Sequence, residues 1–300
     1  MRLLPLLTAA LVAGGLAAPV AVATANPCAP WTVTVLASGL GSLENVEPDG
    51  NGGLFLSATG GVERFTRTGG VRLVTAATSP GGLRVHGGAL FFNTGDALQS
   101  GALGSADGTI QRLDLKSGKR TTWAAGLTMP NGLVLLPDGS ALTSRDLTGG
   151  HPTGITRVAD HRRQESWSNQ PDSNGMAVDP TGRWLYSDET FTAASNVYRT
   201  EIAHPTNRQV VVSLAAIGAP KGLDDLTLAT SGTLYLAANG AGQVIRLDPR
   251  TKASCVVAAG LHNTSAVKQG RGGSFPMSRL YVTGFDGRLL ELTPPAGVTP

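Results

Sequence analysis

Apolar and polar residues alternate in short stretches along most of the chain, and turns that contain glycine separate these stretches. Residues 131–142 and 174–185 are the clearest examples, because each opens on Asn-Gly, alternates, turns at a second glycine and continues as an apolar stretch. Alternation with a period of two residues and closely spaced turn residues predict antiparallel β-strands and not helices. The β-hairpin is therefore the expected unit of structure.

The hairpin pattern recurs at intervals of roughly 40 to 50 residues. Two further copies have a turn one residue shorter and cover residues 44–56 and 224–236, and two weaker copies cover residues 82–92 and 265–283. Each hairpin continues into further strands, so that the repeating unit is a four-stranded meander. Such a meander cannot bury both of its faces alone, and six of them are expected to stack around a channel. The predicted fold is an all-β, six-bladed β-propeller.

The two ends of the chain are predicted to meet in the last blade. The sixth copy ends after its third strand at residues 287–292, whereas residues 31–39 resemble the fourth strand at residues 255–260. We therefore expect the N-terminal strand to complete the sixth blade, which leaves no open sheet edge between the first and last blades. Cys28 and Cys255, the two cysteines of the chain, would then lie at neighbouring blade rims. One disulfide is predicted, with two free buried thiols as the alternative.

The first 25 residues have the pattern of a secretory signal peptide. Met1-Arg2 precedes an apolar stretch from Leu3 to Val22, and small residues precede the expected cleavage after Ala25. A membrane anchor is the alternative, but the stretch contains glycines and prolines and no cationic cluster follows it. Residues 26–300 are expected to form a single secreted propeller domain, monomeric and without a membrane span.

The charge of the chain argues against a nucleic-acid partner. The formal net charge is +3 and charged residues make up only 15% of the chain, with no basic cluster beyond Arg162-Arg163. Proteins that bind nucleic acid gather Lys and Arg on one face, and this sequence has no such footprint.

Four residues with side-chain oxygens open the innermost strands of four predicted blades: Glu44, Asn131, Asn174 and Asp224. The first strand of each propeller blade lines the channel, so these side chains are expected to meet near the axis at one mouth. Taken singly, Asn before Gly is more typical of a turn. Four oxygen donors at one repeat position, two of them anionic, instead favour one divalent cation, Ca²⁺ before Mg²⁺.

These motifs resemble those of the gluconolactonase and regucalcin (senescence marker protein) family, and more distantly those of paraoxonase and strictosidine synthase. The likeness covers nearly all of residues 26–300. It rests on a Glu ten residues before an apolar strand (Glu44 and Leu54), on two Asn-Gly openings (Asn131 and Asn174), and on an Asp that opens the next strand (Asp224). The resemblance implies that these positions bind a divalent metal, three of them directly, with Asn131 facing substrate and water.

The sequence departs from the family pattern at three places. Asn45 follows Glu44 where the family has Gly, Asp225 follows Asp224 where the family also has Gly, and Met129 stands where sugar-lactone members have an Arg. The missing Arg favours an apolar or differently shaped ester or lactone over a sugar acid.

By the same resemblance the reaction would be hydrolysis of a lactone or related ester, in which the cation polarises the carbonyl and a carboxylate takes a proton from the attacking water. Asp224 is the predicted base and metal ligand, Asp225 is the second choice for the base, and Asn131 is the predicted substrate contact.

Two other functions remain open from the sequence. One is a non-catalytic secreted propeller that serves as a binding module with a structural metal, because a fold does not fix a function. The other is condensation chemistry like that of strictosidine synthase, which no motif selects. His86, His151 and His262 are expected on loops or at the rim and not in catalysis.

Overall fold

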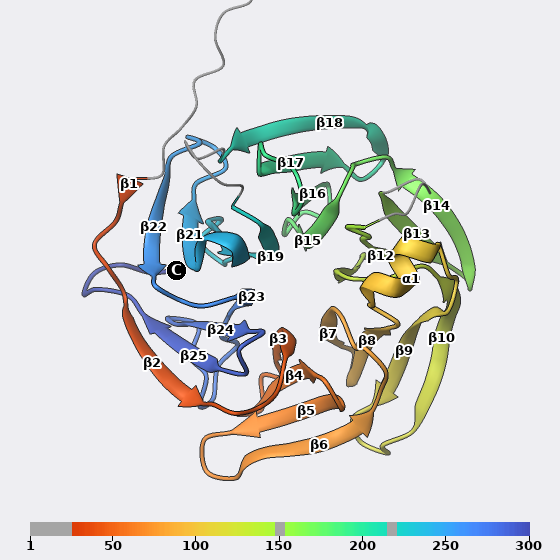
Figure 1. Ribbon diagram of the computed structural model, residues 1–300, viewed down its shortest axis with the longest axis horizontal. Coiled ribbons are helices and arrows are strands. Elements are labelled where there is room, and N and C mark those ends of the chain that lie inside the picture. The colour runs from red at the N-terminus through yellow and green to blue at the C-terminus, as the bar shows by residue number, and fades with distance from the viewer. Residues whose placement is uncertain (1–25, 148–153, 215–220) are drawn as a thin grey trace, which may run out of the picture.

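The computed structural model describes residues 26–147, 154–214 and 221–300. The predicted signal peptide and His151 lie outside these residues. Within them the strands form a ring of six sheets around a central axis (Figure 1). The prediction of an all-β six-bladed propeller is confirmed.

Each of the first five blades is a meander whose strands pair in chain order. Blade 1 consists of β3 (Leu43–Pro48), β4 (Leu54–Ala58), β5 (Gly61–Thr66) and β6 (Gly70–Ala76). Blade 2 consists of β7 (Leu83–His86), β8 (Ala89–Thr94), β9 (Gly108–Asp114) and β10 (Arg120–Leu127). Blade 3 consists of β11 (Leu133–Leu135), β12 (Ala141–Thr143), β13 (Ile155–Ala159) and β14 (Arg162–Ser168).

The second half of the ring repeats the arrangement. Blade 4 consists of β15 (Ser173–Val178), β16 (Trp184–Glu189), β17 (Asn196–Glu201) and β18 (His204–Ser213). Blade 5 consists of β19 (Leu223–Leu228), β20 (Leu234–Ala238), β21 (Gln243–Leu247) and β22 (Ser254–Ala259). Blade 6 takes β23 (Thr264–Gln269), β24 (Leu280–Gly284) and β25 (Leu289–Thr293) from the C-terminal end of the chain.

The outer strand of blade 6 comes from the N-terminal end, as predicted. Strand β2 (Thr32–Ala37) pairs antiparallel with β25, and the two residues of β1 (Asn26–Pro27) pair in parallel with β22 of blade 5. The predicted disulfide between Cys28 and Cys255 is present, with the two Cα atoms 5.3 Å apart. The N-terminal segment therefore spans two blades and closes the ring.

The hydrophobic core lies between neighbouring blades, because the two faces of each sheet carry alternate apolar side chains. Between blades 5 and 6, Trp31 lies against the buried Tyr235 with ring centroids 5.5 Å apart. The same cluster takes Val267 and Leu280 from blade 6. Burial of such side chains stabilises the fold by roughly 1.5 to 3 kcal/mol each.

Two short helices interrupt the strands of the described residues, and the sequence did not predict them. Helix α1 (Leu98–Leu103) lies between β8 and β9, and the 3₁₀ turn η1 (Asn239–Ala241) follows β20. Both follow the second strand of a blade, where the chain returns to the mouth at which the innermost strands begin. Across the described residues, no helix has the length and apolar character that crossing a membrane would require.

Candidate metal centre

A pocket of about 680 Å³ opens at the mouth where the innermost strands begin. Three of the four predicted ligands, Glu44, Asn131 and Asp224, line it. Asn174 does not line it, but it is almost completely buried and donates a hydrogen bond to Asp224, which does. Residues up to 180 positions apart in the chain, 44 to 224, thus converge as the repeat predicted.

Three of the predicted ligands sit at irregularities of the sheet. The pairing register shifts between Leu43 and Asn45, so that Glu44 is the unpaired residue. Equivalent shifts between Ser173 and Met176 and between Leu223 and Leu226 leave Asn174 and Asp224 unpaired. A β-bulge bends the strand and redirects the side chain it carries, which aims these residues at the mouth.

Hydrogen bonds connect the predicted ligands in pairs. Asn131 Nδ2 lies 3.4 Å from Glu44 Oε1, and Asn174 Nδ2 donates to Asp224 Oδ1 at 3.0 Å. The second oxygen of Asp224 accepts from Asn239 Nδ2 at 3.2 Å. A half-turn about the terminal torsion exchanges the oxygen and nitrogen of such an amide, so either Asn can present its oxygen instead.

The glycines after the two asparagines permit close packing of blades and do not form turns. A side chain at Gly132 would collide with the carbonyl of Asn174, and one at Gly175 would collide with the backbone of Asp225. Neither glycine has a positive φ. The Asn-Gly motif therefore marks the point where adjacent blades approach each other, and the reading of these asparagines as turn residues is wrong.

A side chain of the preceding blade donates a hydrogen bond to the backbone beside each predicted ligand. The acceptor is the carbonyl oxygen of the ligand residue or of the residue before it in the chain. Asn93 Nδ2 donates to Asn131 O at 2.8 Å and Ser144 Oγ donates to Asn174 O at 2.6 Å. Ser265 Oγ donates to Leu43 O at 2.6 Å, and Thr190 Oγ1 donates to Leu223 O at 2.7 Å. We call these four donors, Asn93, Ser144, Thr190 and Ser265, the carbonyl clamps.

Two further carboxylates lie at the mouth and were not predicted from the sequence. Asp96 and Asp146 line the same pocket, each a few residues after the second strand of its blade. Asp146 is buried, and its Oδ1 has no hydrogen-bond partner. The signal that could have found them is a polar residue just after each second strand, since in an antiparallel meander that point returns to the mouth.

The gathered carboxylates disfavour one another's charge. Burial, followed by the charges of Asp146 and Asp225, raises the pKa of Glu44 to about 8. Burial also raises the pKa of Asp146 to about 6. The pKa values of Asp96 and Asp224 are raised well above their usual range by burial and then by Glu44 and Asp146. Such a set is stable as anions only with a cation among them.

Asp225 lies in a different environment from Asp224. Its Oδ2 is 2.6 Å from Lys268 Nζ, and both side chains are buried, with 6% of each exposed. Asn45 Nδ2 and the Leu226 amide also donate to this carboxylate. Asp225 is therefore paired with a cation of the chain and does not line the pocket, whereas Asp224 lines it.

Two of the histidines expected on loops or at the rim, His86 and His262, belong to the described residues, whereas His151 lies outside them. His86 and His262 are exposed and do not line the pocket. His86 ends β7, just before the turn that leads to β8.

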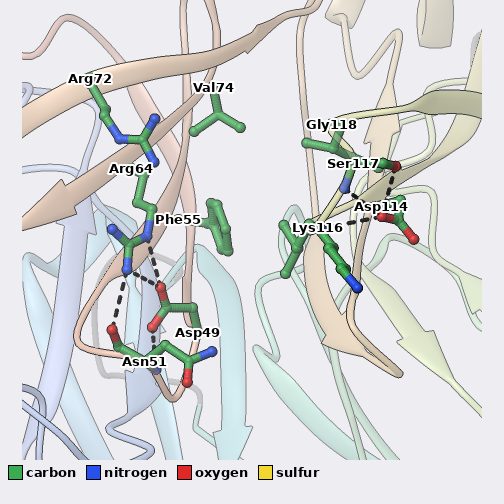
Figure 2. A pocket seen from close by; sticks show the side chains of 12 residues that line it. Asp49, Asn51, Phe55, Arg64, Arg72, Val74, Asp114, Lys116, Ser117 and Gly118 are labelled. Carbon is green, nitrogen blue, oxygen red and sulfur yellow. Dashed lines mark hydrogen bonds and ion pairs between the residues drawn. The ribbon is translucent and has the colours of Figure 1, made fainter.

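A second pocket, of about 510 Å³, lies between blades 1 and 2 at the opposite face of the ring, beside the β3–β4 and β9–β10 turns. Figure 2 shows Arg64 directed at Asp49, with Arg64 Nε 2.8 Å from Asp49 Oδ2. Across the pocket Asp114 accepts from Ser117 at 2.8 Å. The carboxylates of Asp49 and Asp114 are therefore both held by groups of the chain itself.

The residues at the mouth fit a hard divalent cation. None of the described residues that line the pocket is Lys, Arg or His. Among the described residues, no three His, Cys, Asp or Glu side chains are arranged to hold a metal by themselves. A cation at this mouth would therefore take amide oxygens from Asn131 and Asn174 besides the carboxylates. Oxygen-only sets of this kind are typical of Ca²⁺ sites.

Fold and mouth together define a six-bladed propeller with an acidic, oxygen-lined mouth. Residues 148–285 match the family model described as the SMP-30/gluconolactonase/LRE-like region, so the resemblance predicted from the sequence is confirmed. No curated protein matches the chain.

Solved structures agree on the fold. A gluconolactonase from Xanthomonas campestris is similar at a TM-score of 0.69 and 18% identity, over 88% of this chain and 90% of that one. A luciferin-regenerating enzyme is similar at 0.68 and 12% identity, over 90% and 97%. The calcium-binding protein regucalcin from Agrobacterium tumefaciens is similar at 0.63 and 18% identity, over 93% and 96%.

Proposed function

We propose that this chain is a secreted, calcium-dependent hydrolase of lactones or related esters. The observation that carries the proposal is the mouth: two carboxylates and two amides from blades 1, 3, 4 and 5 converge there, with further carboxylates beside them and no described basic side chain on the wall. The names of the similar gluconolactonase and calcium-binding regucalcin support the activity and the metal. The Cys28–Cys255 bridge supports an oxidising compartment.

Glu44, Asn131, Asn174 and Asp224 would hold the cation, and the four carbonyl clamps would keep their backbones in place. When bound, Ca²⁺ would supply a positive charge that polarises the ester carbonyl. Asn131 lines the pocket and would contact the substrate beside the ion.

Asp224 is the proposed general base. Its carboxylate would take one proton from a water molecule as the water oxygen bonds to the carbonyl carbon. The bond from that carbon to the ring or ester oxygen then breaks, and Asp224 returns the proton to the departing oxygen. Asn174 and Asn239 each donate to one oxygen of Asp224, which fixes the orientation of the carboxylate. General-base catalysis of this kind contributes roughly 10²- to 10⁴-fold.

The test measures metal binding and turnover separately. Calorimetry with Ca²⁺ on the chelated protein gives the affinity, and a panel of lactones and aryl esters with Ca²⁺ and then with chelator gives the activity. The Asp224→Asn variant is expected to lose both. Asp114→Asn is the matched control, because Asp114 holds a turn at the opposite face. If calcium binds and no ester is turned over, a binding module with a structural ion replaces the hydrolase.

A further inference from the structure

An apolar rim surrounds the acidic floor of the pocket. Leu98, Phe191 and Phe285 line the pocket and remain 63%, 55% and 37% exposed. They come from three separate blades: Leu98 opens α1 in blade 2, Phe191 follows β16 in blade 4, and Phe285 follows β24 in blade 6. Exposed apolar side chains that gather around one opening mark a binding surface.

The packing of α1 fixes one side of this rim. A side chain at Gly101 would collide with Met129 Sδ and approach the carbonyl of Leu147, so the helix lies close against the buried Met129. Met129 itself lines the pocket, as Leu98 does. The position where an Arg was missing from the sequence therefore belongs to an apolar wall.

The polar groups of the pocket offer little to a charged or polyhydroxylated ligand. An anionic substituent would meet the carboxylates and no basic side chain of the described wall. The hydroxyl of Thr190 donates to Leu223 O and accepts from Asn174, and Asn239 donates to Asp224. Because Thr190 and Asn239 already make hydrogen bonds within the site, the hydroxyl groups of a sugar would lose their hydrogen bonds to water without gaining equivalent bonds to the protein.

We propose that the pocket takes an uncharged ester or lactone with an apolar alkyl or aryl substituent. The carbonyl group lies at the acidic floor beside Asp224, and the substituent lies between Leu98, Phe191 and Phe285. This substrate class rests on the proposed hydrolase function and makes it specific: sugar lactones and anionic esters are poor substrates.

The kinetic test uses γ-lactones whose alkyl substituent lengthens from methyl to octyl, with D-glucono-1,5-lactone as the polyhydroxylated comparison. Each methylene is expected to raise kcat/KM by about two- to fourfold until the chain passes the rim. The glucono-lactone is expected to fall roughly tenfold or more below the hexyl compound. A flat series, or a preference for the sugar lactone, overturns the substrate class while leaving the hydrolase standing.

Variants of the rim connect the preference to the structure. Phe191→Ser is expected to lower the ratio of kcat/KM for the octyl lactone to that for the methyl lactone by about tenfold. The matched control is Leu103→Ser, because Leu103 lies on α1 and is 66% exposed but does not line the pocket. Equal effects of the two substitutions would contradict the assignment of the rim.

A binding measurement separates this inference from the function on which it rests. 2-Alkylcyclopentanones have a ring carbonyl and an apolar chain but no ester bond to hydrolyse, and calorimetry measures their binding in the presence of Ca²⁺. Affinity that rises with chain length supports the apolar pocket even if no ester is turned over, in which case only the hydrolase fails. Without ketone binding and without turnover, both proposals fail.

Discussion

The channel has two layers of buried charge that are neutralised in different ways. In the lower layer Asp225 pairs with Lys268, and Glu47 accepts from Arg271 Nη1 at 3.4 Å. In the upper layer, at the mouth, Glu44 and Asp224 meet only other carboxylates and amides. Where a buried carboxylate has only a structural role, a Lys or Arg side chain of the same chain pairs with it. Among the described residues that line the mouth, the upper layer has no such cation, which supports the proposal that a divalent ion binds there.

The largest expected effect comes from removing the cation of the lower layer. Lys268→Met leaves Asp225 buried without its partner, and we expect the free energy of unfolding to fall by about 3 to 5 kcal/mol. Urea denaturation measures the change, with the exposed Lys119→Met as control, expected to lie within about 0.5 kcal/mol of the parent protein. A loss below about 1 kcal/mol would show that the two layers do not differ as described.

Calcium is expected to neutralise the carboxylates of the upper layer, as Lys268 neutralises Asp225 in the lower layer. At a concentration one hundred times its Kd, Ca²⁺ is expected to raise the free energy of unfolding by about 2.7 kcal/mol, because it binds only the folded chain. Thermal melting with Ca²⁺ and with chelator tests this. Asp224→Asn should remove the increment and Asp114→Asn should keep it; an increment that survives in Asp224→Asn places the ion elsewhere.

In the chelated protein, protons bound to the carboxylates at the mouth can neutralise them in place of the metal ion. The pKa of Glu44 is raised to about 8 and that of Asp146 to about 6, whereas both are near 4 in an unfolded chain. The folded state therefore binds more protons than the unfolded state between about pH 4 and pH 8, so stability is full at low pH and is lost as the pH rises through these values.

Urea midpoints in chelator from pH 5 to 8.5 measure this slope. Glu44→Gln removes one of the titrating groups and should flatten the curve, while Asp114→Asn should not. A chelated protein that gains stability over this range would refute the electrostatic description of the mouth.

The smallest expected effect concerns the carbonyl clamps. Ser144→Ala removes the hydrogen bond to Asn174 O and should cost about 1 kcal/mol of stability, together with a several-fold loss of calcium affinity. Ser57 makes the same bond to Gly81 O at 2.5 Å, at a blade whose first strand carries no predicted ligand. Ser57→Ala should therefore cost stability alone. Equal calcium affinities in the two variants would reduce the clamps to ordinary packing bonds.

The features that recur in every blade could be predicted from the sequence. The features that depend on contacts between neighbouring blades could not. The strands, the closure by residues 31–39 and the convergence of Glu44, Asn131, Asn174 and Asp224 follow from one pattern with a fixed register. Whether a metal binds there stays a prediction.

Asp96 and Asp146 were not found, because they lie a few residues beyond the second strand of their blades, after the end of the hairpin pattern on which the prediction rested. The β-bulges and the pairing of Lys268 with Asp225 were also not found. They depend on how one blade meets the next, which no local spacing encodes.

The position of β2 in blade 6 has a consequence for biosynthesis. This strand leaves the ribosome before every other strand of its sheet, yet its partner β25 is made only after the strands of the other five blades. Until then β2, with its apolar Val33 and Val35, is an unpaired edge open to incorrect pairing. The strand must remain unpaired in the nascent chain while five blades are synthesised. A substitution that hinders its pairing with β25 is therefore expected to cause aggregation during expression.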